Sequence, residues 1–230
     1  MPRRTPRTPH ALGELGRVRL SRHFFLRNFL NSEIGNVDGV PNLPVDPDLA
    51  IAAGRGLCEH LLEPMVETFG PLEVRSGYRS PSLNAYGNAM QRLGRRGYEC
   101  ASNEWNRAGH IWDVRDRDGR MGACATIVIP WFADRFAEGR DWRDLAYWMF
   151  DHLPFESALF FPKLCAFNLT WKEGEPARKV SSYVVPKGTL IAPGGEPPEG
   201  PAARRARWSD FPPFQGILYP GALAGRRERA

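Results

Sequence analysis

The chain has 230 residues, of which 42% are hydrophobic, and this is enough to bury one sizeable core. The N-terminal segment has no apolar run long enough for a signal peptide, and no later segment is long enough to cross a membrane. We therefore expect one main domain, kept in the cytoplasm or packed into a particle assembled there, without a membrane partner.

The net charge is +5, and arginines gather near both ends of the chain. Such ends can contact nucleic acid, but they are more often merely solvated, so nucleic acid is not the partner we expect. The four cysteines are widely spaced and include no C-x-x-C pair. This spacing predicts reduced, buried thiols rather than a cysteine zinc site.

In chain order, residues 1–19 are expected to form a flexible basic arm. Ser21 suits the cap of a short helix, and Asp46 or Asp48 suits the cap of a long one. Apolar spacing then predicts helices over residues 20–30, 46–69, 82–97, 121–137 and 141–153, and strands over residues 72–76, 157–161 and 166–171. The mixture of helices and strands predicts an α+β fold.

Residues 186–230 are rich in Pro, Gly, Ala and Arg, so little secondary structure is expected there. The segment cannot build its own core, yet its apolar side chains could dock on the domain or on a neighbouring subunit. These side chains are Trp208, Phe211, Phe214, Ile217, Leu218 and Tyr219. The composition therefore favours a homo-oligomer or a larger assembly held through the two ends.

A stretch over residues 100–115 begins as a polar loop and contains a short predicted strand at residues 110–114. Alternation along a strand would place Ile111 and Asp113 on one face and His110 and Trp112 on the other. An aspartate among such neighbours is costly to bury without a partner. Asp113 is therefore either a functional residue or a structural one bonded to a nearby backbone group or arginine.

Two motifs resemble one known family. Asn106 to Asp113 read N-x-x-G-x-I-x-D, similar to the H-x-x-G-x-A-x-D motif of the D-Ala-D-Ala zinc carboxypeptidases, which have a Hedgehog-type metallopeptidase fold. Residues 76–84 read S-G-Y-R-S-P-S-L-N, similar to a second motif of that family. The resemblance implies a small antiparallel sheet flanked by helices over residues 20–185, between the arm at 1–19 and the tail at 186–230.

The same resemblance implies a ligand cleft. The family's arginine faces this cleft and binds a carboxylate, and Arg79 is the matching residue, with Ser76 and Tyr78 beside it. Asp113 matches a zinc ligand. A planar guanidinium suits the two oxygens of a carboxylate, although a structural ion pair is the alternative role for Arg79.

The chain departs from the family at three positions. Asn106 and Asn168 stand where the family has its two zinc histidines, and Phe161 stands where it has its general-base glutamate. Catalytic zinc needs three protein ligands, and a neutral amide is a poor one. We therefore expect no catalytic residue, no bound metal and no cofactor. The alternative is a weak calcium or magnesium site made by Asp113, Asn106, Asn168 and Glu104.

Three functions follow as hypotheses. In the first, a catalytically inactive metallopeptidase-like domain binds a carboxylate-ended ligand, either a cell-wall-type peptide or a protein partner. In the second, the chain is a structural component of a phage particle or another bacterial assembly. In the third, it remains a hydrolase with a non-standard ligand set, and zinc is then required. A serine or cysteine nucleophile with a histidine partner is not recognisable in the sequence.

Overall fold

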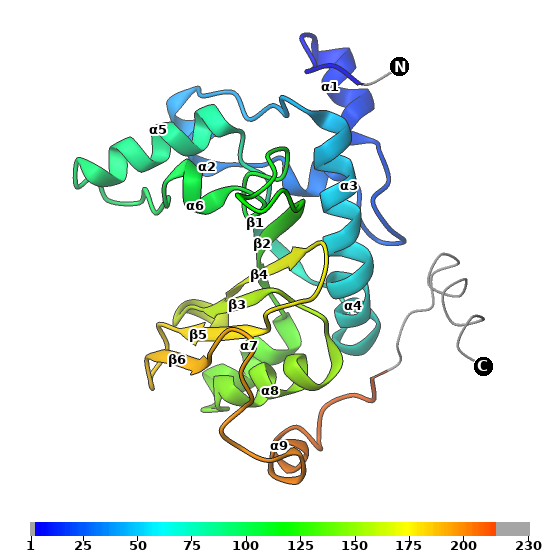
Figure 1. Cartoon of the computed structure of the whole chain (residues 1–230), viewed down its shortest axis with the longest axis vertical. Helices are drawn as coiled ribbons and strands as arrows, with labels where there is room; N and C mark the ends of the chain where they lie inside the picture. Colours follow the sequence, from blue (N-terminus) through cyan, green and yellow to red (C-terminus); the bar gives the residue numbers. More distant parts are fainter. Residues whose placement is uncertain (1–2, 215–230) are drawn as a thin grey trace.

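The computed structural model describes residues 3–214 and is organised around one six-stranded sheet (Figure 1). The strand order is β1-β2-β4-β3-β5-β6, and all neighbouring pairs are antiparallel except β3 with β5. The strands are β1 (Glu73–Ser76), β2 (Gly122–Val128), β3 (Ser157–Phe160), β4 (Phe167–Lys172), β5 (Lys179–Ser182) and β6 (Gly188–Ile191). The predicted α+β class is confirmed, whereas the sheet is mixed rather than purely antiparallel.

Helices precede, connect and follow the strands. They are α1 (Pro9–Gly16), α2 (Glu33–Asp38), α3 (Pro47–Leu57), α4 (Glu63–Phe69), α5 (Pro81–Arg92), α6 (Asn103–Asn106), α7 (Pro130–Ala137), α8 (Trp142–His152) and α9 (Pro201–Arg207). Two 3₁₀ turns, η1 (Leu26–Phe29) and η3 (Lys163–Cys165), and the π-helical turn η2 (Cys58–Leu62) complete the set.

The predicted long helix over residues 46–69 is confirmed, because α3, η2 and α4 follow one another without a break. The Asp46 side chain caps it by accepting a hydrogen bond from the Leu49 amide at 3.0 Å. Pro64 lies in the first turn of α4, directly after the wider η2 turn. Proline lacks an amide hydrogen, so a widened turn before it relieves the clash that a regular helix would suffer.

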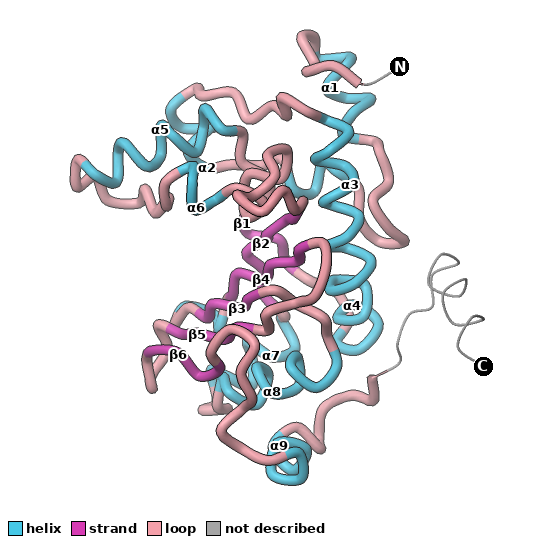
Figure 2. The backbone as a smooth tube through the Cα atoms, viewed as in Figure 1, coloured by secondary structure: helices cyan, strands magenta, loops and turns pink. Residues whose placement is uncertain are grey.

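One face of the sheet forms the core. Alternate residues of the central strands point into it, and the helices cover them: Ala123, Ala125 and Ile127 of β2, Ala158 and Phe160 of β3, and Phe167 and Leu169 of β4. Figure 2 shows α3 and α4 along one side of the sheet and α7 and α8 below it. The contacts are close, because the ring of Trp142 in α8 lies 5.1 Å from that of Phe160.

Two local predictions are wrong. Residues 122–128, expected to be helical, form the central strand β2, because the run Thr126, Ile127 and Val128 is β-branched and pairs with neighbours on both sides. The strand expected over residues 110–114 is instead a series of turns. Ala108 adopts a left-handed φ of 49°, and its amide bonds to the Ile111 and Val114 carbonyls, which folds this stretch back on itself.

The segment after residue 20 also differs from the prediction. Only the 3₁₀ turn η1 forms there, and Ser21 caps no helix. Its hydroxyl instead donates to the buried carboxylate of Glu63 at 2.5 Å. A polar group taken out of water needs such a partner, and the bond ties this segment to the start of α4.

The two ends of the described chain pack on the domain. The expected arm contains α1, whose Leu15 is buried in the core, and β6 extends the sheet beyond residue 185. After β6 the chain crosses α8, where Arg207 pairs with Asp144 at 2.7 Å, and Phe211 is buried against α7. Ile217, Leu218 and Tyr219 lie outside the described residues. Within residues 3–214, no helix is long and apolar enough to span a membrane.

Candidate functional site

The second face of the sheet is polar. Because side chains alternate along a strand, the residues between the core positions point away from the helices. Strand register joins them into rows, in which Cys124 pairs with Thr170 and Thr170 with Ser157, while Thr126 pairs with Asn168. Lys179 and Ser181 of β5 extend the rows beyond β3. The result is a floor of hydroxyl, thiol, amide and ammonium groups, with the apolar side chain of Leu159 between Asn168 and Ser181.

This floor is the base of a cavity of about 460 Å³. Its wall comes from α6 and the turns that follow, which contribute Asn106, Arg107, Gly109 and His110. Trp105, also a lining residue, is 85% exposed. A large apolar side chain with so little cover at the edge of a polar cavity is well placed to contact a ligand.

The structure brings together the two asparagines that the sequence singled out. Asn106 and Asn168 both line the cavity, although they lie far apart in the chain. The Asn168 side-chain oxygen accepts a hydrogen bond from Thr126 at 2.5 Å, and the Asn106 amide donates to Asn84 at 2.8 Å. Both amides are therefore held in place by neighbouring side chains.

Asp113 serves a different part of the molecule and is not among the cavity-lining residues. Its Oδ2 accepts hydrogen bonds from the Val45 amide at 2.7 Å, the Asp46 amide at 3.3 Å and the Tyr78 hydroxyl at 2.9 Å. Its Oδ1 is buried without a partner among residues 3–214. Burial raises the pKa of Asp113 despite these bonds, and Asp113 in turn helps to raise the pKa of Tyr78.

Arg79 is half-buried beside the cavity floor. Its guanidinium donates to the Cys100 thiol at 3.2 Å and to the Ser76 hydroxyl at 3.3 Å. Within the described chain it has no acidic partner, so the structural ion pair considered from the sequence is not formed. Burial first, and then the positive charge of Arg79, lower the pKa of His110 to about 3.

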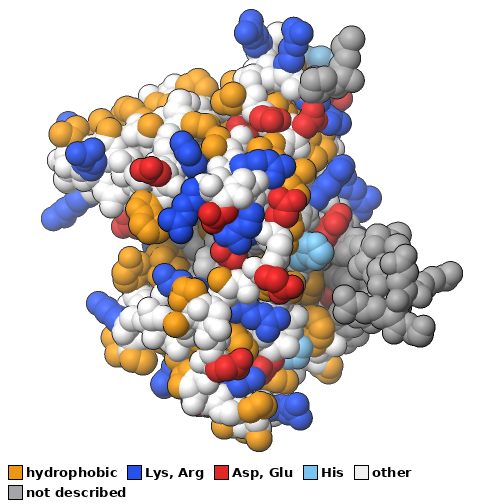
Figure 3. Space-filling view, viewed as in Figure 1, with side chains coloured by type: hydrophobic (Ala, Val, Ile, Leu, Met, Phe, Trp, Pro, Cys, Tyr) orange, Lys and Arg blue, Asp and Glu red, His pale blue; other side chains and the backbone are white. Residues whose placement is uncertain are grey.

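The cavity carries an excess of positive charge. Arg107 and Lys179 line it, and neither side chain has an acidic partner in the part of the chain that is described. Lys172 is neutralised by Asp116 at 3.0 Å, and the lining acid Glu156 lies 3.5 Å from Arg120. Figure 3 shows Lys and Arg side chains around α6 and β2, interspersed with acidic ones. An anionic group is the ligand that this balance favours.

The structure also reveals a cysteine–histidine pair that sequence reasoning missed. The Cys124 sulfur lies 3.7 Å from Nε2 of His110, and Nδ1 of His110 lies 2.8 Å from the Gly77 carbonyl oxygen. Burial raises the pKa of the Cys124 thiol to about 11, so the thiol is protonated at neutral pH. The misassigned helix over residues 121–137 hid this pair, because only a strand aims Cys124 at the cavity.

Phe161, at the position of the lost general base, is half-buried and not among the cavity-lining residues. It packs beside Val128, Ala133 and Ala166. Its ring centroid lies 5.9 Å from that of Tyr183. The residue thus makes apolar contacts at the end of β3.

A second cluster has the spacing of a metal site. His23, Glu63 and Glu67 offer ligand atoms that lie within 4.8 Å of one another. Their atoms already have protein partners, because Glu63 bonds to Nδ1 of His23 at 2.6 Å and Glu67 to Arg22 at 2.9 Å. The cluster joins the segment before η1 to α4, which agrees with a structural role for His23.

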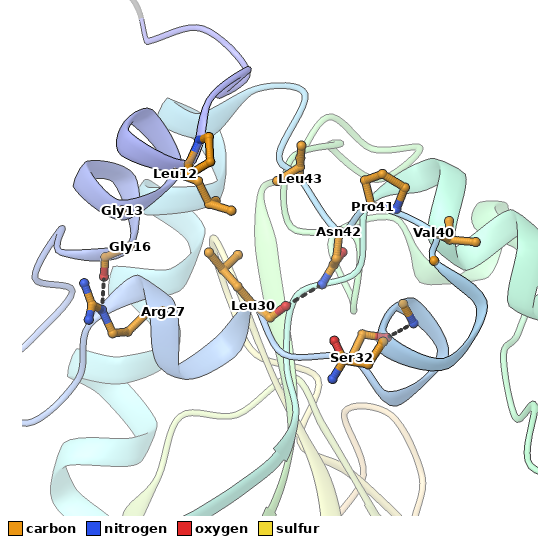
Figure 4. A pocket seen from close by; sticks show the side chains of 14 residues that line it. Leu12, Gly13, Gly16, Arg27, Leu30, Ser32, Val40, Pro41, Asn42 and Leu43 are labelled. Atoms are coloured by element: carbon orange, nitrogen blue, oxygen red, sulfur yellow. Dashed lines mark hydrogen bonds between the residues drawn. The ribbon is translucent and has the colours of Figure 1, made fainter.

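A larger cavity of about 790 Å³ lies between α1, η1 and the loop over residues 39–43 (Figure 4). Leu12, Leu30 and Leu43 point into it. The Asn42 side-chain amide donates hydrogen bonds to the Leu30 carbonyl at 3.0 Å and to the Tyr78 carbonyl at 2.8 Å. This cavity offers apolar contacts and no convergent reactive groups, so the sheet cavity is the better candidate site.

Comparisons with protein-family models, with curated proteins and with solved structures gave no match to this chain.

Proposed function

We propose that this chain is a non-catalytic, Hedgehog-type metallopeptidase-like domain that binds a carboxylate-bearing ligand, of the cell-wall peptide type, in the sheet cavity. One observation carries the proposal. Arg107 of the wall and Lys179 of the floor line the cavity without acidic partners in the described chain, beside amide and hydroxyl groups of the floor. A carboxylate would satisfy these cations, and the floor would bond the polar groups of a peptide.

The absence of catalysis belongs to the same proposal. Asn106 and Asn168 already bond to Asn84 and Thr126, and an amide is a poor ligand for zinc. Phe161 can accept no proton from a water molecule. The proposed domain therefore recognises a peptide end without cleaving it.

Calorimetric titration of the full chain tests this function. The probes are an alanyl-D-alanine peptide with a free carboxylate and the same peptide as its C-terminal amide. We expect the free acid to bind and the amide to bind about tenfold more weakly or not at all, because a charge-assisted hydrogen bond contributes about 1.5–3 kcal/mol. Equal affinity for the two peptides would contradict a carboxylate site.

Substitutions then locate the anchor. Lys179→Ala and Arg107→Ala should each weaken binding of the free acid about tenfold, since each removes one cation from the cavity. Arg79→Ala tests whether the half-buried guanidinium, which bonds Ser76 and is not among the lining residues, contributes from beside the floor. Lys187→Ala is the matched control, because Lys187 is exposed and lies outside the cavity lining. Unchanged affinity in both Lys179→Ala and Arg107→Ala would overturn the site.

A further inference from the structure

Cys124 and His110 are arranged as two ligands of one small ion. Cys124 is 4% exposed and His110 is 5% exposed, yet both residues line the sheet cavity. The sulfur-to-nitrogen distance is 3.7 Å. Metal–sulfur and metal–imidazole bonds together span about 4.3 Å, so one ion can bridge the pair with a bent geometry and little movement of either side chain.

The histidine is already oriented for this role. Nδ1 lies 2.8 Å from the Gly77 carbonyl oxygen, and only a protonated Nδ1 can donate to that acceptor. The Nε2 lone pair then faces the sulfur of Cys124. Metal-bound histidines typically use the second ring nitrogen in this manner, with a backbone carbonyl fixing the ring.

Charge selects the kind of ion. A thiolate, a neutral imidazole and a monovalent cation sum to zero charge, which suits a buried position. A divalent ion would leave one uncompensated positive charge close to the cationic Arg79, whose backbone amide donates to the His110 carbonyl at 2.8 Å. Asp113 is bonded elsewhere and Glu156 is near Arg120, so neither is free to balance it.

We infer that Cys124 and His110 form a binding site for a soft monovalent cation, with copper(I) as the biological ion of that class. Copper(I) prefers thiolate and imidazole ligands and accepts low coordination numbers. Asn168 lines the same cavity, but its side-chain oxygen accepts from Thr126 at 2.5 Å, so it is not counted as a ligand. The site is reached through the same cavity as the proposed carboxylate ligand, but it does not depend on that ligand.

Binding should release one proton. The thiol must lose its proton to bind the ion, whereas the imidazole binds through Nε2 in the neutral form in which Nδ1 donates to the Gly77 carbonyl. Below the thiol pKa, the apparent affinity should therefore fall about tenfold for each unit by which the pH decreases. A divalent-metal site that also deprotonates a second group would show a steeper dependence.

The test is an anaerobic titration of the reduced full chain with copper(I) in competition with bicinchoninate. We expect one bound equivalent in the wild type, and at least a tenfold loss of affinity in Cys124→Ser and in His110→Gln. Cys165→Ser and Cys58→Ser are matched controls, because those thiols are buried away from the cavity lining and should leave binding unchanged. Zinc offered in the same assay should bind more weakly.

X-ray absorption on the wild-type complex provides a readout that does not depend on any variant folding. One sulfur and one nitrogen neighbour are expected around copper. No retained copper(I), a shell of two or more sulfurs, or an equal loss in all cysteine variants would overturn the site.

Discussion

His110 and Asp113 lie close together in the chain but face different parts of the molecule. His110 lines the sheet cavity beside Cys124, whereas Asp113 holds the loop at Val45 and Asp46. Strand alternation also placed these two residues on opposite faces, and the turns that replace the predicted strand keep them apart. Asp113 is thus a structural anchor in the described structure, as one of the two readings of the sequence proposed.

Asp113→Ala should lower the free energy of unfolding by about 3 kcal/mol, because the Val45 amide and the buried hydroxyl of Tyr78 lose their acceptor. Asp113→Asn keeps an acceptor oxygen and should cost less. Urea denaturation measures both changes. Asp134→Ala, on the exposed side of α7, serves as the control and should stay near the wild-type value. A wild-type stability for Asp113→Ala would refute the anchoring role.

The same carboxyl should make stability depend on pH. Burial raises the pKa of folded Asp113 above 3.8, its ordinary value, so the folded chain binds this proton more tightly than the unfolded chain does. The resulting stabilisation is full below the unfolded pKa and is lost as the pH rises through the folded pKa. Relative to Asp113→Asn, the wild type should therefore gain stability as the pH falls toward about 4. Parallel curves for the two proteins would rule out this shift.

At the scale of elements, α3 crosses the sheet at a glycine. A Cβ at Gly56 would meet the ring of Trp171 at 2.3 Å, whereas a Cβ at Gly13 in α1 would meet nothing within 4 Å. Gly56→Ala should destabilise the protein by about 2–3 kcal/mol through overpacking, and Gly13→Ala should stabilise it by about 0.5–1 kcal/mol. Thermal melting distinguishes the two, and similar shifts for both would contradict the close approach of α3 to β4.

Sequence patterns identified the elements whose conformation is set by local signals in their own residues. The cap at Asp46 and the apolar stripe predicted the long helix, and apolar runs located β3 and β4. The patterns failed at β2. An apolar run of this length suits a short strand as well as a helix, and only pairing with β1 and β4 decides between the two. The residues of the cavity could be predicted only in part for the same reason. Asn106 and Asn168 could be named from the sequence, but the contact of Cys124 with His110 could be found only once the strand register of β2 was known.

For the whole molecule, the segment after β6 is a strap across α7 and α8. The Phe211 ring lies 5.3 Å from that of Trp131 and 5.8 Å from that of Phe69, and Arg204 pairs with Asp151 at 2.7 Å. The tail up to residue 214 thus docks on its own domain, one of the two outcomes considered for it. Residues beyond β5 therefore complete the fold instead of merely extending it.

Phe211→Ala should cost about 3 kcal/mol, because it empties a buried site among aromatic rings. Phe214→Ala, at a residue that is 38% exposed, is the matched control and should cost less. Denaturant unfolding compares the two variants. If both have the same small effect, the strap contributes little to the fold.

The central claim is that an anionic peptide end binds on the polar face of the sheet. NMR titration of the isotope-labelled full chain with the free-carboxylate peptide tests it most directly. We predict that the largest chemical-shift changes fall on residues of the sheet cavity, at Lys179, Ser181, Arg107 and the Trp105 indole, and that the C-terminal amide peptide produces much smaller ones. Changes centred on the apolar cavity at Leu12 and Leu43, or none with either peptide, would contradict the account.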